Sequence, residues 1–152
     1  MRIVVLSVGR WKRGPERALF DHYAARCPWR LELVELAVKG KVAPGELPGA
    51  EAKLLRAALP AGLPTLALDE RGEQLDSAGF AALLGAWRDQ ARGGVVCLIG
   101  GADGLDGSLR QTADRTLSFG RLTWPHLLVR ALLAEQLYRA STILAGHPYH
   151  RA

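Results

Sequence analysis

Apolar segments of strand length alternate with segments of helical spacing along the whole chain, and this alternation limits the possible folds more than any other feature. The strand-like segments are the apolar runs at 2–8, 31–38, 63–72 and 95–99. The segments in which apolar residues recur every three or four positions lie at 15–27, 50–59, 77–94 and 125–146. Such alternation is typical of α/β domains. We therefore predict a mostly parallel sheet with helices on both faces.

The ends of these segments carry their own signals. Ser77 fits the N-cap of the helix that it begins, and Pro125 fits the first position of the longest helix. Between 105 and 124 we expect a short helical turn near 108–113, followed by a short strand and a loop. Because the chain has 152 residues without an internal repeat or a long linker, we expect one domain over residues 1–152.

Composition argues against several classes of protein. No apolar run reaches the roughly 20 residues of a membrane-spanning helix, and the apolar segment after Arg2 is too short for a secretory signal. We therefore expect a cytoplasmic protein that does not span a membrane. Cys27 and Cys97 are far apart and lack metal-ligand spacing, so we expect buried thiols, with neither a disulfide framework nor a metal site.

The net charge of +5 is concentrated in the first quarter of the chain. Residues 1–41 contain nine basic and four acidic side chains, so the remaining residues sum to zero. A basic surface suggests an acidic partner such as nucleic acid, although Arg-rich composition also reflects codon usage. In the loop Arg10-Trp11-Lys12-Arg13, the charges can contact phosphate and the indole can stack on a base. The alternative is an ordinary surface loop.

Ligands of open α/β sheets bind at the carboxyl ends of the strands, so the loops there are candidates for a site. These loops are 9–14, 69–74, 100–107 and 118–124. In LIGGADGLDG, the glycines allow backbone N–H groups to approach a ligand because glycine has no Cβ. The segment has neither the Gly-Lys-Ser/Thr of a P-loop nor the position of a dinucleotide motif. The pattern leaves open whether the glycines serve a ligand or only tight turns.

Three charged residues, Arg130, Glu135 and Arg139, interrupt the apolar pattern of the last helix. Glu135 and Arg139 are four positions apart and are expected to form an ion pair, whereas Arg130 lies on the opposite side. Some of these charges are expected to be buried with partners or covered by a ligand or second chain, unless they are simply solvated. The chain then ends in GHPYHRA, whose proline and ring side chains are unusual for a disordered end.

The segments VVCLIGGADGL, LSFGRLTWPHLLVRALLAEQLYRA and HPYHR resemble the RlmH family, and the likeness extends over nearly the whole chain. This family consists of SPOUT-class methyltransferases that modify N3 of a pseudouridine in 23S rRNA of the large ribosomal subunit. The resemblance implies an α/β fold with a C-terminal trefoil knot and a homodimer. It also implies S-adenosylmethionine as the cofactor and ribosomal RNA, within the assembled ribosome, as the substrate.

The resemblance further implies which residues act at the site. The cofactor would be bound by Leu68, Gly100, Phe119, Gly120, Arg121, Leu122, Thr123 and Trp124. We expect the tail residues to dock at the boundary between two copies of the chain and to order around the target base with the charges of the last helix. The catalytic candidates are therefore His150, Tyr149, Arg151, Arg130, Glu135 and Arg139. His150 is the preferred acid or base because imidazole titrates near neutral pH.

The predicted RNA contacts are Arg10, Lys12 and Arg13. Two alternative functions remain open. One is a non-catalytic RNA-binding or ribosome-associated factor that uses the same basic segment. The other is a SPOUT methyltransferase that acts on another RNA nucleotide.

Overall fold

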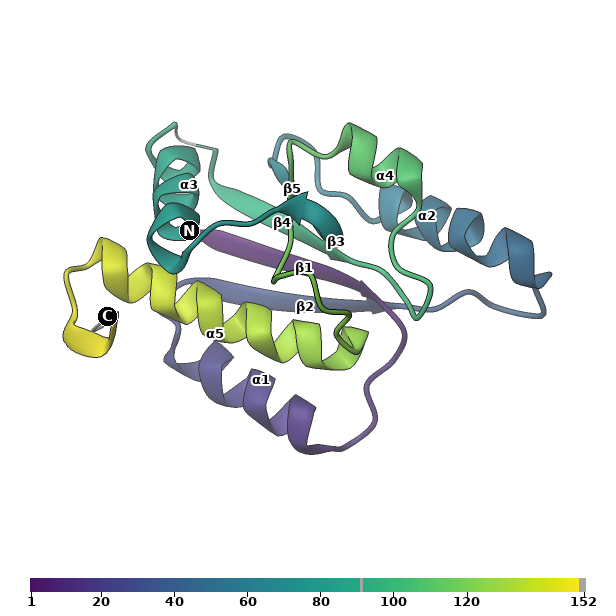
Figure 1. Cartoon of the computed structure of the whole chain (residues 1–152), viewed down its shortest axis with the longest axis horizontal. Coiled ribbons are helices and arrows are strands. Elements are labelled where there is room, and N and C mark those ends of the chain that lie inside the picture. The colour runs from purple at the N-terminus through teal and green to yellow at the C-terminus, as the bar shows by residue number, and fades with distance from the viewer. Residues whose placement is uncertain (91, 151–152) are drawn as a thin grey trace.

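The computed structural model describes residues 1–90 and 92–150 and shows one twisted sheet with helices on both faces (Figure 1). The strands are β1 (Arg2–Val8), β2 (Arg30–Leu36), β3 (Thr65–Glu73), β4 (Gly94–Ile99) and β5 (Arg115–Leu117). They lie in the order β2-β1-β4-β3-β5, and each neighbouring pair is parallel. The predicted fold class is confirmed.

The helices divide into two layers. They are α1 (Pro15–Arg26), α2 (Leu47–Ala57), α3 (Ser77–Asp89), α4 (Gly107–Thr112) and α5 (His126–Leu144), with single 3₁₀ turns η1 (Pro44–Glu46) and η2 (Pro148–His150). Helices α3 and α5 pack on one face of the sheet, and α1 packs beside α5 on the same side. Helices α2 and α4 cover the other face (Figure 1).

Strand β4 is buried along its whole length because both faces of the sheet are covered. Val95, Cys97 and Ile99 face α3 and α5, whereas Val96 and Leu98 face α2 and α4. This alternation is the two-residue period of a strand. It explains why the segment reads as a continuous apolar run.

Both cysteines are free and buried, as the sequence predicts. Burial raises the pKa of the Cys97 thiol to about 12, so this side chain packs in the core as an uncharged group at neutral pH. Within the described ranges, no helix combines the length and the apolar character that crossing a bilayer requires.

The starts of two helices differ by one residue from the prediction. Asp76, rather than Ser77, caps α3, and its Oδ1 accepts a hydrogen bond from the Gly79 N–H at 2.7 Å. Ser77 is the first helical residue, and its hydroxyl donates to Gln136 of α5. Pro125 is the N-cap of α5, with extended backbone, rather than its first helical residue.

Helix α5 returns across the sheet beside α1 and α3 after the loop that follows β5 (Figure 1). This loop begins where β5 pairs with the far end of β3. The backbones approach so closely there that a Cβ on Gly72 would lie 2.5 Å from the carbonyl carbon of Leu117. Only glycine fits at this contact. The trefoil knot that the family resemblance implies stays a prediction.

We expect Gly72→Ala to destabilise the protein by about 1–3 kcal/mol, because the added methyl group forces β3 and β5 apart. Urea unfolding measures this loss. Gly49→Ala is the matched control: this helical position has open space around its Cβ, so the substitution should be neutral or stabilising by up to about 1 kcal/mol. Equal stability of the two variants would contradict the close contact.

Candidate active site

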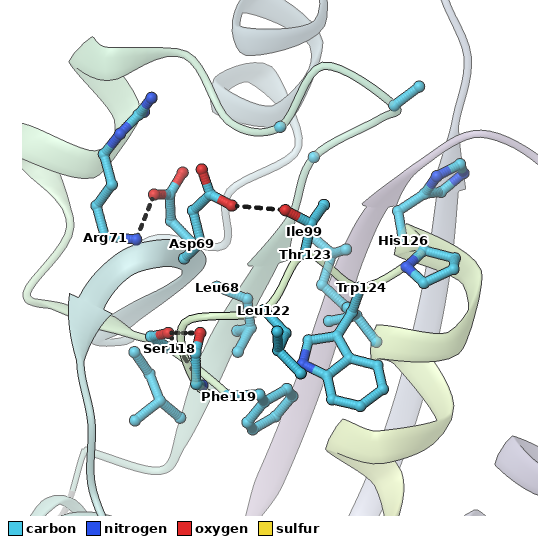
Figure 2. Close-up of a pocket in the computed structure, with 18 of the residues that line it drawn as sticks. Leu68, Asp69, Arg71, Ile99, Ser118, Phe119, Leu122, Thr123, Trp124 and His126 are labelled. Carbon is cyan, nitrogen blue, oxygen red and sulfur yellow. Dashed lines mark hydrogen bonds between the residues drawn. The ribbon is translucent and has the colours of Figure 1, made fainter.

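A cavity of about 590 Å³ lies at the carboxyl ends of β3, β4 and β5 (Figure 2). Its walls come from the segments that end these strands, residues 68–71, 99–104 and 117–126 without Arg121, and from Val129 of α5. Loops after parallel strands converge at this edge of a sheet. Three of the four loops predicted to bind a ligand therefore meet in one place.

Most of the predicted cofactor-binding residues line this cavity. They are Leu68, Gly100, Phe119, Gly120, Leu122, Thr123 and Trp124. The side chain of Arg121 belongs to the same loop and is exposed. Leu68, Ile99 and Phe119 give the cavity an apolar wall on which the ring of a ligand can pack (Figure 2).

The turn after β4 depends on glycine. A Cβ on Gly100 would lie 2.4 Å from the carbonyl carbon of Gly104, and Gly104 itself has φ +77°. The Gly104 N–H donates to the Gly101 carbonyl at 3.0 Å and closes the turn. The sequence left open whether these glycines serve a ligand or a tight turn. The same residues make the tight turn and line the cavity, so the two roles are compatible.

The loop after β5 is held at two points. The Ser118 hydroxyl bridges the backbone of Gly120, which has φ +111°, by donating to its carbonyl and accepting from its N–H. Further along, the Thr123 hydroxyl donates to a carboxylate oxygen of Glu70 at 3.2 Å and ties the loop to the end of β3 (Figure 2). The loop is thus shaped before any ligand binds.

The charged groups around the cavity are mainly acidic. Glu70 and Asp103 supply carboxylates, against one lining guanidinium, that of Arg71, while the carboxylate of Asp69 is paired with Arg110 at 3.3 Å. Burial, and then the nearby charge of Arg130, lowers the pKa of His126 below its usual range, so this lining imidazole is neutral at physiological pH. The cavity therefore suits a ligand that carries positive charge.

A buried carboxyl group lies beneath the glycine turn. A Cβ on Gly101 would lie 2.8 Å from Oε1 of Glu51, a residue of α2 that is only 8% exposed. Burial, with some repulsion from Asp103, raises the pKa of Glu51 above its ordinary value, while the Gly101 N–H opposes this shift by hydrogen bonding. The protonation state of the Glu51 carboxyl group therefore affects the turn that lines the cavity.

A second cavity, of about 570 Å³, shares a wall with the first. The shared residues are Leu117–Gly120 and Trp124. On its other side it is lined by Phe80 and by Glu135 and Gln136 of α5. Trp124 lies between the two cavities with 40% of its surface exposed, so its indole can contact ligands in either.

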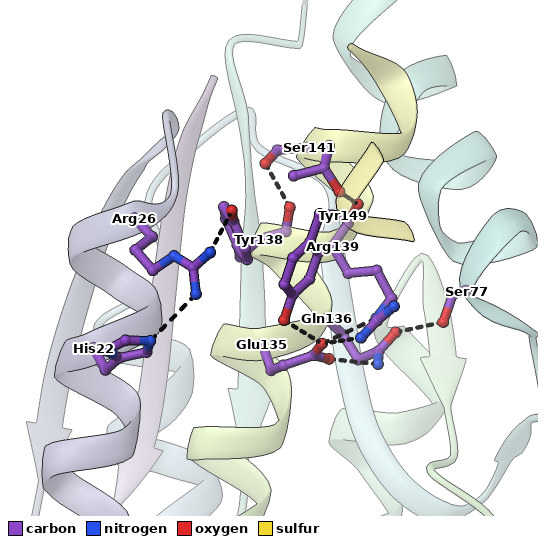
Figure 3. Close-up of polar contacts among 10 residues, drawn as sticks. His22, Arg26, Ser77, Glu135, Gln136, Tyr138, Arg139, Ser141 and Tyr149 are labelled. Atoms are coloured by element: carbon purple, nitrogen blue, oxygen red, sulfur yellow. Dashed lines mark hydrogen bonds and ion pairs between the residues drawn. The ribbon is translucent and has the colours of Figure 1, made fainter. Parts of the chain in front are cut away.

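Glu135 is the centre of a polar network at this second cavity (Figure 3). Its Oε1 accepts from Arg139 Nε at 2.9 Å, the ion pair that the sequence predicts, and from the Tyr149 hydroxyl at 3.3 Å. Its Oε2 accepts from Gln136 Nε2 at 2.7 Å, and Gln136 is in turn held by Ser77. The carboxylate is therefore fixed in position before any substrate arrives.

The tail folds back onto α5 through η2. The ring centroids of Tyr149 and Tyr138 lie 4.6 Å apart, and the guanidinium carbon of Arg139 lies 5.0 Å from the ring centroid of Tyr149 (Figure 3). Burial, and hydrogen bonding to Tyr23, raise the pKa of Tyr149 to about 12. Nδ1 of His150 is buried without a hydrogen-bond partner in the described ranges. Arg151 lies outside the described residues.

Comparison with known proteins shows the family of the chain. The family described as "Predicted SPOUT methyltransferase" matches residues 1–150. The chain belongs to the SPOUT methyltransferases. It is also 53% identical over 152 residues to ribosomal RNA large subunit methyltransferase H of Rhodospirillum centenum, with 100% of both chains covered. The relative of the same name from Ruegeria pomeroyi is 52% identical over 157 residues, with 99% of each covered. Within the SPOUT proteins, the chain therefore belongs to this RlmH family.

Solved structures support the fold. The chain resembles a probable methylase family protein from Haemophilus influenzae, with a TM-score of 0.57 and 10% identity, over 99% of this chain and 70% of that one. A probable methyltransferase from Bordetella pertussis gives the same TM-score at 16% identity, over 92% of this chain and 95% of that one. At these identities the likeness concerns the SPOUT fold alone.

The structure does not bring all of the predicted catalytic residues together. Glu135, Arg139 and Tyr149 meet in one network, and His150 follows Tyr149 in the same turn. Arg130 is instead fully buried at the end of β1, where its guanidinium contacts Glu35. Among the residues that the structure describes, no group of three or more potential ligands could hold a metal ion.

The sequence reasoning missed Glu51 and the partners of the tail. Glu51 stands four positions before Leu55, so both face the core from α2, and a carboxylate at that spacing could have been noticed. Arg26 stacks on Tyr138 at 4.5 Å and donates to its hydroxyl at 2.9 Å, across 112 positions of sequence. No local pattern indicates that contact, because only the packing of α1 on α5 creates it.

We expect Glu51→Gln to raise the melting temperature at pH 8 but hardly at pH 4. The raised pKa means that the fold favours the protonated carboxyl, so its contribution is complete below the unfolded-state pKa, about 4.3, and is lost as pH rises. The neutral amide removes that loss. Thermal unfolding across this pH range measures it, with the exposed Glu46→Gln as control. A difference from the native protein that does not change with pH would contradict the assignment.

Proposed function

We propose that the protein transfers a methyl group from S-adenosylmethionine to N3 of a pseudouridine in 23S rRNA of the large ribosomal subunit. Methyl transfer is the activity of its family, and relatives at about 50% identity are named ribosomal RNA large subunit methyltransferase H. The observation that carries the proposal is the cavity at the carboxyl ends of β3, β4 and β5, lined by the loop residues that the family resemblance implies for the cofactor.

The residues of the first cavity fit S-adenosylmethionine, which supplies an electrophilic methyl group on a sulfonium when bound. A volume of about 590 Å³ is in the usual range for a ligand of this size. Leu68, Ile99 and Phe119 would hold the adenine ring, while the Gly100 turn, which a Cβ would fill, admits the ligand close to the backbone. The acidic residues around the cavity favour the positive sulfonium.

We place the target base in the second cavity, next to Trp124. Methyl transfer needs an acceptor held near attack distance and aligned, and two cavities that share one wall allow this. Trp124 offers a flat surface on which a base can stack. The fixed Glu135 carboxylate and the Gln136 amide can hydrogen-bond to the polar edge of the base.

The N3–H of the base must lose its proton for N3 to act as the nucleophile. His150, which lies in the turn η2 that packs on α5, is the proposed base. Arg139 and Arg151 would stabilise the negative charge that develops on the base. The high pKa of Tyr149 keeps its hydroxyl protonated, so it donates hydrogen bonds rather than accepting the proton.

The proposed active form is a homodimer in the cytoplasm. Leu122 is 71% exposed and Trp124 is 40% exposed at the opening of the site, and a second copy would cover such apolar side chains. Since the chain is small, RNA recognition is expected to use its basic N-terminal quarter, including Arg10, Lys12 and Arg13, and the surface of the assembled ribosome.

Methylation of purified ribosomes that lack the modification tests the function directly. With S-adenosylmethionine carrying a labelled methyl group, we expect one labelled nucleoside, N3-methylpseudouridine, identified by mass spectrometry of digested 23S rRNA. Label on another nucleoside would favour a SPOUT enzyme of different specificity. Binding to ribosomes without methylation, and without a melting shift by S-adenosylmethionine, would favour the non-catalytic factor.

Removal of residues 147–152 should leave the affinity for S-adenosylmethionine within about threefold but slow methylation by about 10²- to 10⁴-fold, because the tail carries the proposed acid–base group. Single-turnover methylation and calorimetric binding measure the two effects. Tyr149→Phe is the matched control: it keeps the ring contacts with Tyr138 and Arg139 and removes only the hydroxyl. Native methylation rates after truncation would rule out a catalytic tail.

A further inference from the structure

A buried guanidinium joins α5 to the end of β1. Arg130 is 0% exposed, and its Nη2 donates to the carbonyl oxygens of Val8 at 2.7 Å and Gly9 at 2.9 Å. Its Nη1 donates to Oε1 of Glu35 at 3.0 Å. Gly9, with φ +92°, is the residue at which the chain leaves β1 for the basic loop. Arg130 therefore holds the start of that loop.

The same carboxylate oxygen also holds the loop itself. Oε1 of Glu35 accepts a hydrogen bond from the backbone N–H of Trp11 at 2.6 Å. One oxygen atom of β2 thus receives donors from α5 and from the basic loop. The Trp11 backbone cannot shift without disturbing the pair of Glu35 and Arg130.

The indole of Trp11 makes a third contact that holds the loop, after those of Arg130 with Gly9 and of Glu35 with the Trp11 backbone. Its ring centroid lies 5.0 Å from the guanidinium carbon of Arg130 and 5.6 Å from that of Arg17, and it meets Phe20 edge-on at 5.4 Å. With Trp11 directed inward, the neighbouring Arg10, Lys12 and Arg13 are all exposed. The buried cluster therefore presents three cations on an anchored loop.

Burying the polar groups of this cluster costs free energy, so the cluster is a poor means of stabilising the fold. The Nε of Arg130 and the Nε1 of Trp11 are buried without hydrogen-bond partners in the described ranges. Buried ion pairs seldom stabilise a protein more than apolar residues of the same size would. A role in placing the loop accounts for the cluster better than a role in stability.

We propose that Arg130 is a positioning residue for RNA binding, which fixes the loop of residues 10–13 through Glu35 and Trp11 so that its cations meet the phosphate backbone. The inference rests on the proposed function and changes the predicted role of Arg130, which acts on the substrate through the loop rather than at the target base. Holding the cations in place reduces the conformational entropy that RNA binding would otherwise remove.

The cluster also adjoins the wall of the first cavity. His126 lies about one turn before Arg130 on α5 and Val129 directly precedes it, and both line that cavity. A Cβ on Gly9 would lie 3.5 Å from Nε2 of His126, so the end of β1 packs against this imidazole. The start of the basic loop and the wall of the first cavity therefore meet at the contact of Gly9 with His126.

The test is a mutant cycle that combines Arg130→Met with the double substitution Arg10→Ala, Lys12→Ala. Affinity for large-subunit RNA is measured between about 50 and 300 mM salt, a range in which contacts with phosphate make the affinity depend strongly on salt. We expect Arg130→Met to weaken binding by about 10-fold and to lower the salt slope by about 1, as loss of one or two phosphate contacts does. Added to the loop substitutions, it should cause no further loss.

Three controls separate position from charge and from folding. Arg115→Met removes one exposed cation on β5 and should leave RNA affinity within about twofold. Arg130→Lys keeps the charge but not the planar fork, so it should resemble Arg130→Met. Affinity for S-adenosylhomocysteine reports an intact cofactor site, and Glu35→Gln, at a half-buried position, replaces Arg130→Met in the cycle if that variant does not fold.

Full additivity of Arg130→Met with the loop substitutions, or native RNA affinity and salt slope in the folded variant, would overturn the positioning role. Either result leaves the proposed methyl transfer intact, because native protein still methylates ribosomes. Conversely, absence of methylation by native protein would refute the proposed function, while non-additive RNA binding would still support the role of Arg130.

Discussion

Strand β4 hydrogen-bonds with β1 on one side and with β3 on the other, and all three run in the same direction. This pairing brings the loops after the central strands to one edge of the sheet, where the first cavity lies. Because β4 is buried on both faces, its register is specified by packing on two sides. The position of the Gly100 turn, and with it the first cavity, follows from that register.

The general location of the site could be predicted from the sequence because strand ends and glycine-rich loops are local features. Gly100 stands directly after β4 and Gly120 stands three positions after the end of β5. The parallel arrangement follows from the alternation of strands and helices. The residues predicted to bind the cofactor were taken from the family resemblance, and most of them line the cavity at the expected edge. What the sequence could not indicate is the second cavity, which exists only because α5 returns beside that loop.

The polar contacts of α5 show where sequence reasoning reaches its limit. The pair of Glu135 and Arg139 lies within one helix, so its spacing was sufficient to predict it. The partner of Arg130 is Glu35, 95 positions away on another strand, and nothing in either segment identifies the other. For the same reason, buried Glu51 and the stacking of Arg26 on Tyr138 depend on packing between distant elements. The predicted N-cap of α3 was wrong by one residue because Asp76 and Ser77 are both good capping residues.

The contact between Arg130 and the Val8 carbonyl spans 122 positions and therefore concerns the order in which the chain is synthesised. β1 and β2 emerge from the translating ribosome first, yet Val8, Gly9 and Glu35 have no guanidinium to bind until α5 follows. Until α5 has been made, water must satisfy the polar groups of these three residues. Because the contact joins segments that are far apart in the chain, its closure costs more conformational entropy than a local contact and slows folding.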